Sequence, residues 1–373
     1  MAEVVKGLAG VVVAESKISK VLGEEGRLIY RGYDIHDLAK HATFEEVAHL
    51  LWTGSLPDAK ELEAFRKDLA DFRTLPDELV ELITGPLAEA SPMAALRTGV
   101  SALSAFGPEP APTPEGTLAA GAGILAKTPM IVAAHHRAQQ GEDPVAPPKD
   151  ETFAGAFLHA LNGEAPTPEA RDTMDMALVL HADHGFNAST FSARVTASTL
   201  SDVYSAVTSA IGTLKGGLHG GANTNVMKLL EKIDGAGSDP VEHVQGMLER
   251  KEKVPGFGHR VYRTMDPRAV HLKEKSQNLG QETGEPKWYE MTAAIQEHIH
   301  EAKGLWPNVD LYSASVYRSL GIDKGYYTPI FAISRMSGWL AHVAEQLEDN
   351  KLIRPRAEYV GPMDLDWVPI DQR

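Results

Sequence analysis

The sequence contains no cysteine among its 373 residues. This absence excludes disulfide bonds, thiolate nucleophiles and zinc sites built from thiolates. Basic residues are also scarce, since 36 lysines and arginines stand against 51 acidic residues and give a net charge of −15. Because no stretch rich in lysine or arginine offers a phosphate-binding stripe, we expect no nucleic-acid partner.

Long apolar runs and nucleotide loops are missing as well. No apolar run approaches the ~20 residues that span a bilayer, so we expect no membrane partner. The N-terminus lacks a basic region and carries Glu3 early, which argues against a signal peptide and favours a cytoplasmic protein. Neither G-x-G-x-x-G nor G-x-x-x-x-G-K-[ST] occurs, so neither standard nucleotide-binding loop is predicted.

Helical patterns dominate the chain. Residues 44–54 carry apolar side chains at helical spacing and end at a glycine, and residues 58–73 are strongly amphipathic. Residues 167–181 open with Thr167 as an N-cap, followed by proline. Further helices are predicted at 115–140, 150–161, 201–213, 223–233, 240–251, 287–303 and 327–347. His135 and His136 are expected on a solvated helix face.

Strand-like alternation is confined mainly to the N-terminus. Residues 11–19 and 27–33 flank the sequence G-E-E-G and predict a β-hairpin. The proline-rich segment 107–116 predicts an exposed loop between two helices of one domain. The four glycines of residues 215–221 suit a hinge. The fold class predicted is therefore mainly all-α, with a small N-terminal β-hairpin.

Two short segments combine histidine, glycine and arginine. L-H-G-G-A-N at 218–223 and V-P-G-F-G-H-R-V-Y-R-T-M-D-P-R at 254–268 each place a histidine beside glycines, and Arg263 and Arg268 follow the second histidine. Glycine lets a ligand approach the backbone, arginine matches carboxylate or phosphate oxygens, and histidine transfers protons near neutral pH. The combination predicts a site for an acidic small molecule, which needs a local cluster of positive charge in so acidic a chain.

Three other stretches carry chemistry of the same kind. They are H-A-D-H-G-F-N-A-S-T at 181–190, P-N-V-D at 307–310, and the apolar stretch around Arg335. Taken singly, Asp310 could cap a helix, and Arg335 could form a structural ion pair.

A metal site is the main alternative for the first of these stretches. His181 and His184 are three residues apart and could bind a metal as a pair on one helical face. Gly185 begins to break that helix, however, and no H-E-x-x-H motif occurs in the chain. A metal-dependent hydrolase therefore ranks last among the hypotheses.

Taken together, the segments resemble those of citrate synthase over nearly the whole length of the chain. The deciding motifs are H-A-D-H-G-F-N-A-S-T, G-L-H-G-G-A-N, V-P-G-F-G-H-R-V-Y, D-P-R and P-N-V-D, in this order. The resemblance implies an almost wholly helical fold and a homodimer of the shorter bacterial and archaeal type. It also implies a discontinuous large domain of residues 1–219 and 324–373, and a small mobile domain of residues 220–323.

The resemblance implies a reaction and a role for each motif residue. Acetyl-CoA would condense with oxaloacetate, citryl-CoA would be hydrolysed, and no metal or other cofactor would take part. Asp310 would be the catalytic base, His219 would hydrogen-bond the thioester oxygen, and His259 would polarise and protonate the ketone. The oxaloacetate contacts implied are His184, Arg268, Arg335 and, from the other subunit, Arg354. The CoA contacts implied are Arg263 near the phosphates and the adenine-binding loop of Val254, Pro255, Gly256, Phe257 and Gly258.

Two further hypotheses stay open. A 2-methylcitrate synthase would use propionyl-CoA with the same residues, and one methylene is worth only ~1–3 kcal/mol of discrimination in an apolar pocket. A catalytically silent helical dimer would bind dicarboxylates as a sensor or scaffold. Such a binder would not need a base, so the presence of His219, His259 and Asp310 favours an enzyme.

Overall fold

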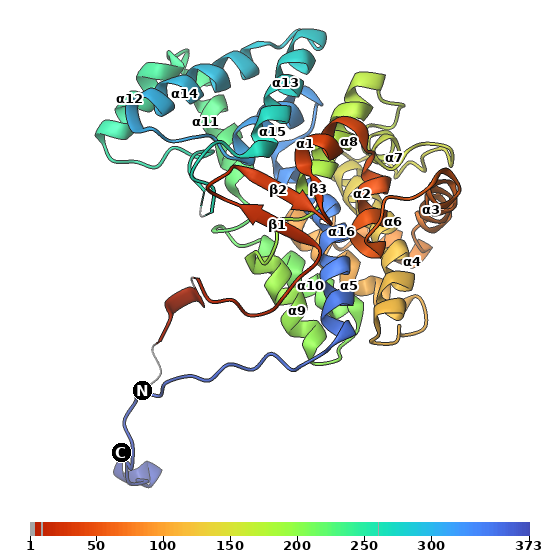
Figure 1. Cartoon of the computed structure of the whole chain (residues 1–373), viewed down its shortest axis with the longest axis vertical. Helices are drawn as coiled ribbons and strands as arrows, with labels where there is room; N and C mark the ends of the chain where they lie inside the picture. Colours follow the sequence, from red (N-terminus) through yellow and green to blue (C-terminus); the bar gives the residue numbers. More distant parts are fainter. Residues whose placement is uncertain (1–3, 9, 260) are drawn as a thin grey trace.

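The computed structural model describes residues 4–8, 10–259 and 261–373 of the chain. Within these ranges it contains sixteen α-helices and one three-stranded antiparallel sheet (Figure 1). Glu3 and residue 260, which belong to two of the segments discussed above, lie outside the described ranges. The prediction of a mainly all-α fold is confirmed.

The helices follow one another with short connections. The first eight are α1 (Ile35–His41), α2 (Phe44–Thr53), α3 (Ala59–Phe72), α4 (Asp77–Thr84), α5 (Pro92–Ala102), α6 (Pro114–Gln139), α7 (Phe153–Asn162) and α8 (Pro168–His181). The last eight are α9 (Ala188–Ser198), α10 (Val203–Leu214), α11 (Ala222–Ala236), α12 (Pro240–Glu249), α13 (Pro267–Glu282), α14 (Lys287–Lys303), α15 (Val309–Ser319) and α16 (Tyr327–Glu348).

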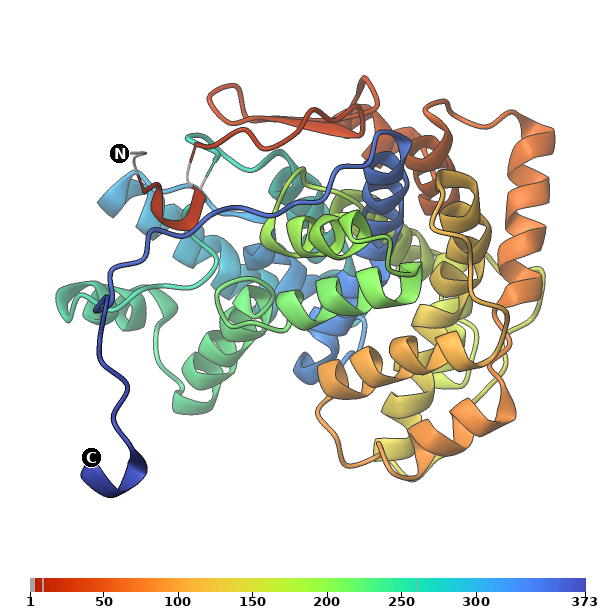
Figure 2. The same ribbon diagram turned by 90° about the horizontal axis from the view of Figure 1, so that it is seen from below.

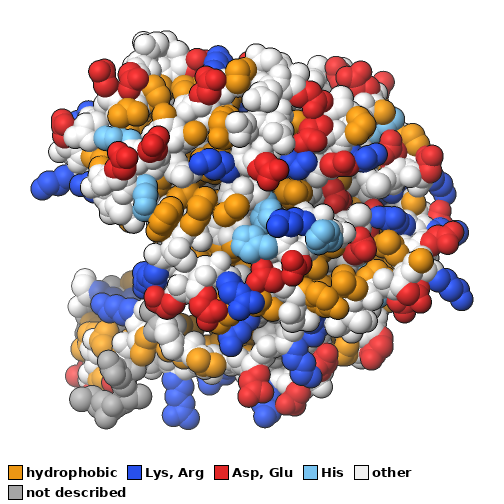
Figure 3. Space-filling view, turned by 45° about the horizontal axis from the view of Figure 1, so that its top comes forward, with side chains coloured by type: hydrophobic (Ala, Val, Ile, Leu, Met, Phe, Trp, Pro, Cys, Tyr) orange, Lys and Arg blue, Asp and Glu red, His pale blue; other side chains and the backbone are white. Residues whose placement is uncertain are grey.

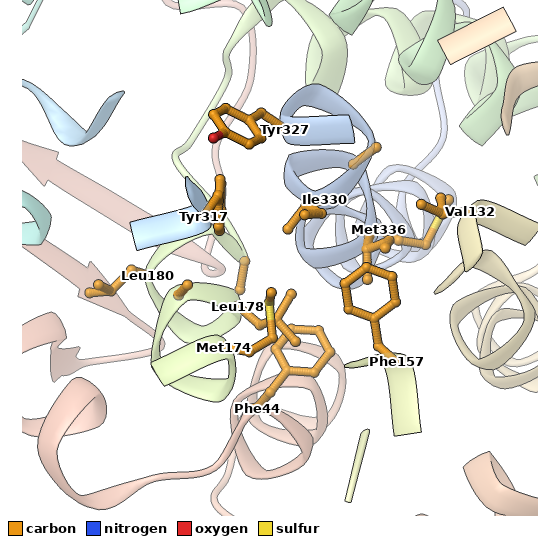
Figure 4. Close-up of a cluster of buried hydrophobic side chains, with 14 of the residues drawn as sticks. Phe44, Val132, Phe157, Met174, Leu178, Leu180, Tyr317, Tyr327, Ile330 and Met336 are labelled. Atoms are coloured by element: carbon orange, nitrogen blue, oxygen red, sulfur yellow. The ribbon is translucent and has the colours of Figure 1, made fainter. Parts of the chain in front are cut away.

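Helix α16 lies at the centre of the larger helical group. It packs against α2, α5, α6, α8, α9 and α10, and side chains on all of its faces are buried. Figure 4 shows part of this core, where Ile330 and Met336 of α16 gather with Val132 of α6, Phe157 of α7 and Met174 of α8. A helix that is apolar all round is expected to be a core helix.

A second group of helices consists of α11 to α15, which contact one another and occupy the upper left of Figure 1. Helices α1 and α8 contact α13 of this group, and α16 contacts α11. The group falls within residues 220–323, the range predicted for the small domain. The exact domain limits and the mobility of this domain stay predictions.

Local capping explains why several helices begin and end where the sequence predicts. In α2, Thr43 and Glu46 form a reciprocal capping box, and Gly54 ends the helix in the left-handed conformation with φ 90°. In α8, the Thr167 side chain accepts a hydrogen bond from Ala170 N, and proline occupies the first turn. The predicted helices at 44–54 and 167–181 are confirmed.

The N-terminal sheet is shorter than predicted. It consists of β1 (Ser19–Leu22), β2 (Arg27–Tyr30) and β3 (Tyr33–Asp34), with Ser19 opposite Tyr30. The hairpin turn over residues 23–26 is confirmed, but the strand expected from residue 11 is wrong. Residues 11–18 have no strand partner in the described part of the chain, and Val12 is 88% exposed.

Helix α6 departs from two sequence-based expectations. By length and composition alone it could cross a bilayer, but 67% of its most apolar window is buried inside the protein. His135 and His136 of this helix are also buried rather than solvated, and the Tyr326 hydroxyl lies 2.8 Å from His135 Nδ1. Packing against α3, α4, α5, α7 and α16 therefore accounts for the apolar character of α6.

Both ends of the chain leave the helical body as extended segments (Figures 1 and 2). The C-terminal segment follows α16 and carries large apolar side chains in solvent, with Trp367 78% exposed. Further exposed members of this set include Tyr359, Val360, Met363, Leu365 and Ile370.

Two carboxyl groups, the buried Glu45 of α2 and the partly buried Asp175 of α8, lie at the start of α2. Both oxygens of Asp175 lie 3.2 Å from Phe44 N, while Glu45 is 1% exposed and accepts a hydrogen bond from Phe153 N. Burial, followed by the charge of Glu45, raises the pKa of Asp175 well above its ordinary value. At pH values between the ordinary pKa of an aspartate and this raised pKa, the folded protein therefore keeps a proton on Asp175 that the unfolded chain has released.

We expect the stability of the wild-type protein to fall as pH rises through the raised pKa of Asp175, because the folded state binds more protons than the unfolded state. Asp175→Asn keeps the shape of the side chain but has no proton to release. Its free energy of unfolding, relative to that of wild type, should therefore grow as pH rises from 5 to about 8. Denaturant unfolding across this pH range measures the difference. The exposed Asp68→Asn serves as control, and parallel curves for all three proteins would contradict the prediction.

Candidate active site

One cavity of about 960 Å³ brings together residues from seven separate parts of the chain. It lies between the N-terminal segment over residues 7–8 and 10–13, β1, the loop after α8, the loop before α11, residues 258–268, the start of α15 and the middle of α16. Figure 3 shows a deep hollow in one side of the molecule, with histidine, lysine and arginine side chains near it. The candidate residues that line the cavity are His184, His219, His259, Arg268, Asp310 and Arg335.

Asp310 lies in the first turn of α15. The helix is capped by Asn308, whose side chain accepts a hydrogen bond from Asp310 N at 3.0 Å and donates one to Gly258 O at 3.0 Å. The hypothesis that Asp310 itself caps the helix is therefore wrong. Burial raises the pKa of Asp310 to about 6, although the nearby Arg268 acts in the opposite direction. A carboxylate with such a pKa is a stronger base than an ordinary aspartate and is still mostly ionised at neutral pH.

His219 lies in the glycine-rich loop between α10 and α11. Its Nε2 atom is 2.8 Å from the Ser189 hydroxyl and accepts a hydrogen bond from Ser189 N at 3.3 Å. Because a backbone N–H only donates, Nε2 is the unprotonated nitrogen and Nδ1 carries the hydrogen. Burial and the charge of Arg335 lower the pKa of His219 to about 4. The ring is therefore a neutral N–H donor at the cavity.

His259 has the opposite tautomer. Its Nδ1 atom accepts two hydrogen bonds, from Val261 N and Tyr262 N, both at 3.0 Å. The hydrogen must therefore be on Nε2. Burial, followed by the charge of Arg268, lowers the pKa of His259 to about 4, so this ring is also neutral. The cavity thus contains two neutral imidazoles whose free N–H groups are fixed by the backbone around them.

Two buried arginines supply positive charge to the cavity. Asp266 binds Arg268 with both carboxylate oxygens, at 2.9 Å from Nε and 2.8 Å from Nη2. Arg335 has no such carboxylate, since its Nε donates to the His181 carbonyl at 2.7 Å and its buried Nη2 has no hydrogen-bond partner among the described residues. The interpretation of Arg335 as one half of a structural ion pair is therefore wrong. An unpaired buried N–H group is costly unless a ligand satisfies it.

His184 completes this group of residues. Its Nε2 atom lies 3.2 Å from the Tyr262 hydroxyl, and its ring meets that of His259 edge-on at 5.2 Å. Burial and the charge of Arg268 lower the pKa of His184 well below its ordinary value. The arrangement suits a small dianion, because two guanidinium groups and three neutral histidines face one cavity.

The family comparison agrees with this geometry. The family described as citrate synthase, C-terminal domain, matches residues 7–356 of the chain. The chain belongs to the citrate synthase family. It is 55% identical over 377 residues to the citrate synthase of Haloferax volcanii, covering 100% of this chain and 99% of that one. It is 42% identical over 368 residues to the 2-methylcitrate synthase of Shewanella oneidensis, covering 98% and 97%.

A solved structure of the family shares the fold. It is the ternary complex of carboxymethyl coenzyme A and oxaloacetate with citrate synthase from Thermoplasma acidophilum. The two chains superpose with a TM-score of 0.93 and 34% sequence identity, over 100% of both. The resemblance to citrate synthase that the five motifs indicated is confirmed.

Six of the predicted binding residues lie outside the cavity, namely Arg354, Arg263 and four residues of the predicted adenine loop. Arg354 is exposed on the C-terminal segment and lines a different cavity, of about 1180 Å³, together with residues of the N-terminal segment. Arg263 is exposed, with Nε 3.9 Å from Glu24 Oε1. Within one subunit, neither residue joins the group around Asp310, so their roles in a citrate synthase stay predictions.

The loop predicted to bind the adenine consists of Val254, Pro255, Gly256, Phe257 and Gly258. Gly256 has φ 85°, and a Cβ atom there would lie 2.8 Å from Leu311 Cδ1, so only glycine fits. Its carbonyl accepts a hydrogen bond from Asn308 N at 3.0 Å, which ties the loop to the start of α15. Only Gly258 of this loop lines the cavity.

The geometry does not support the metal alternative. The His181 ring donates from Nδ1 to Ala177 O at 2.7 Å and packs against Phe331, whereas the His184 ring contacts Tyr262 and His259. In the described ranges, no three histidine, aspartate or glutamate side chains are placed to hold a metal ion.

Several residues that shape the site were not singled out from the sequence. Ser189, which fixes the tautomer of His219, lies within the H-A-D-H-G-F-N-A-S-T motif, and its hydroxyl also accepts a hydrogen bond from Trp339 Nε1 at 3.2 Å. Asn308 lies within P-N-V-D, and Tyr262 lies within V-P-G-F-G-H-R-V-Y. The motifs contained these residues, but their sequence positions alone gave no sign of the contacts that they make.

We expect histidine-labelled protein at pH 7 to show His219 protonated only on Nδ1 and His259 only on Nε2. Long-range proton–nitrogen NMR correlations measure this, with His219→Gln and His259→Gln used for assignment. Both rings should stay neutral down to pH 5, because their pKa values lie near 4, whereas an unperturbed histidine titrates near ~6.5. The same tautomer in both rings, or protonation of either at pH 6, would contradict the assignment.

Proposed function

We propose that the protein condenses acetyl-CoA with oxaloacetate and hydrolyses the resulting citryl-CoA to citrate and CoA. One observation carries the proposal: a carboxylate whose pKa is raised to about 6 and two neutral histidines of opposite tautomer line one cavity with two buried arginines. Membership of the citrate synthase family and the high identity to named citrate synthases support the same reaction.

The buried cations would bind the oxaloacetate dianion. Arg335 offers an unpaired buried N–H group, Arg268 is held rigid by Asp266, and His184 adds a neutral ring beside them. Oxaloacetate would replace water at these groups and satisfy donors that the protein leaves open. This local charge counteracts the repulsion expected from a chain of net charge −15.

The carbon–carbon bond would form inside the cavity, after proton removal from acetyl-CoA. Asp310 takes a proton from the methyl group of acetyl-CoA, and the Nδ1–H group of His219 donates to the thioester oxygen as negative charge develops there. The methyl carbon then attacks the ketone carbon of oxaloacetate. The Nε2–H group of His259 donates to the ketone oxygen and supplies its proton as the bond forms, and His259 regains a proton from water as Asp310 releases the one that it took from the methyl group. Water then cleaves the thioester and releases CoA.

This reaction needs neither a metal nor a redox cofactor. The thioester supplies an activated acyl group, and the developing negative charge is stabilised by neutral N–H donors and by the arginines. Arg263 and the loop over residues 254–258 would bind CoA at the mouth of the site. The reaction would take place in the cytoplasm.

A homodimer would complete each site. The C-terminal segment leaves the body with eight large apolar side chains in solvent, and such a surface is typical of a protein–protein interface. Arg354 lies on the same segment, outside the cavity of its own subunit. In a two-fold dimer, each subunit would supply Arg354 to the oxaloacetate of its partner.

Closure of the small domain would accompany binding. Residues 220–323 would move against residues 1–219 and 324–373, with the glycines of residues 215–221 as a hinge. Oxaloacetate would bind first and bring His259 and Asp310 against it, which would exclude water and complete the site for acetyl-CoA.

The choice between acetyl-CoA and propionyl-CoA and the role of Asp310 can be tested together. We expect thiol release with oxaloacetate to be faster with acetyl-CoA than with propionyl-CoA. Asp310→Asn should lower kcat at least ~10²-fold, because the amide cannot accept the proton, while oxaloacetate still binds. The matched control Asp68→Asn should behave as wild type. In wild type, kcat/KM should fall as pH decreases through about 6, where the base becomes protonated.

Each alternative has a distinct result in this assay. Faster thiol release with propionyl-CoA would identify a 2-methylcitrate synthase. Oxaloacetate binding without thiol release from either thioester would identify a non-catalytic binder. Near-normal turnover by folded Asp310→Asn protein would refute the role of the base.

The shared site can be tested by subunit exchange. Arg354→Ala and Asp310→Asn homodimers should both be inactive, whereas mixing them should restore activity. In the mixed dimer, one site carries both lesions, and the other combines an intact Asp310 with the partner's intact arginine at position 354. Mass spectrometry confirms that mixed dimers form. Mixed dimers without activity would show that Arg354 serves its own subunit.

A further inference from the structure

The turn between β1 and β2 packs directly on the loop that carries His259. Gly23 O accepts a hydrogen bond from Arg263 N at 3.1 Å. A Cβ atom on Gly23 would lie only 2.3 Å from Val261 O and 2.8 Å from Val261 C, both of which are backbone atoms. No side chain fits at such a distance unless one of the two segments moves.

The backbone group that Gly23 touches also holds His259. The carbonyl of Val261 and the N–H of Tyr262 belong to one planar peptide unit, and in a trans peptide they point in opposite directions. This N–H donates to His259 Nδ1 at 3.0 Å. Gly23 thus lies against one end of the unit while the imidazole is bound at the other.

We propose that Gly23 is a positioning residue for His259. Because residue 23 has no side chain, the hairpin turn can rest against the peptide unit of residues 261 and 262, and this unit fixes the Nε2–H tautomer and the direction of the ring. The inference rests on the proposed function, since it concerns the group that donates to the ketone oxygen. It gives a reason for the position of β1, which lines the cavity through Val21 beside Val261.

Gly23 is suited to a test because its backbone does not require glycine. Its φ lies outside the left-handed region, so alanine is allowed there and only the contact with Val261 forbids it. The turn is also partly exposed, so the substitution disturbs no core. Gly26 in the same turn differs, because its φ is 64° and its Cβ atom would meet the Thr264 side chain at 2.6 Å rather than the peptide unit.

The experiment compares Gly23→Ala with two controls. Gly26→Ala strains the same turn without pressing on Val261 O, and Gly107→Ala places a methyl group in open space at an ordinary φ. Each protein is measured for kcat and KM, for the carbonyl stretch of bound oxaloacetate by infrared spectroscopy, and for the tautomer of His259 by NMR. Thermal unfolding and oxaloacetate binding establish that each variant is folded.

We expect Gly23→Ala to lower kcat by about 10- to 100-fold, the cost of misplacing a reacting group by roughly 1 Å, with a smaller change in KM. The shift in the carbonyl stretching frequency of bound oxaloacetate should decrease, and His259 should no longer be present only as the Nε2–H tautomer. Gly26→Ala should lower thermal stability but keep the carbonyl shift and the tautomer. Gly107→Ala should match wild type.

Two results would overturn the inference. One is a folded Gly23→Ala protein with the kcat, carbonyl shift and tautomer of wild type. The other is the same loss of carbonyl shift and tautomer in Gly26→Ala, which would mean that the turn acts only through general stability. Failure of the proposed function is separate, because it would appear as wild-type protein that releases no thiol. The tautomer of His259 is measured without substrate and does not depend on that outcome.

Discussion

The burial of Arg335 in the central helix is the constraint on which the site depends. Helix α16 is the core of the larger helical group, and placing a guanidinium group there is expensive unless each donor finds an acceptor. One donor is satisfied by the His181 carbonyl, and Phe331 lies under the group at 4.6 Å. A remaining donor is open. Burial lowers the pKa of Arg335 to about 10, which leaves it charged at neutral pH.

Burial is the main cause of the neutral state of the neighbouring histidines, and the charge of Arg335 adds to it. A histidine close to a buried cation is disfavoured in its charged form, and burial acts in the same direction. His181, His184 and His219 all have lowered pKa values, with Arg335 among the causes in each case. The pKa of Asp310 changes in the other direction, because burial raises it more than the charge of Arg268 lowers it. One region of low polarity thus yields neutral N–H donors and a basic carboxylate together.

Much of this arrangement could be predicted from the sequence, and the limits have physical reasons. Helix ends depend on neighbouring residues, so the sequence indicated the glycine at the end of α2 and the Thr167 cap of α8. His135 and His136 were misassigned because their burial depends on Tyr326, which lies almost two hundred residues away in the chain. The strand expected from residue 11 failed because alternation cannot supply a partner strand.

At the site, the sequence predicted which residues meet but not their protonation. The motifs named the residues that line the cavity, because the chemistry requires particular residue types. They did not show which nitrogen of His219 or His259 carries the hydrogen. For His219 this depends on Ser189, thirty residues away, and for His259 on the local turn that directs the Val261 N–H group at the ring. Residue identity is local information, whereas tautomer and pKa are properties of the assembled site.

The pairing of α6 with α16 has a consequence for biosynthesis. Helix α6 ends at Gln139, and its main partner α16 begins only at Tyr327. At ~5–20 residues per second, a ribosome needs about 10 to 40 seconds to synthesise the chain between them. During this time α6 can pack against α3, α4, α5 and α7 but lacks α16, so part of its apolar surface stays uncovered. The core around α6 is therefore completed only when the last helix of the chain has been made, through contacts between residues far apart in the sequence.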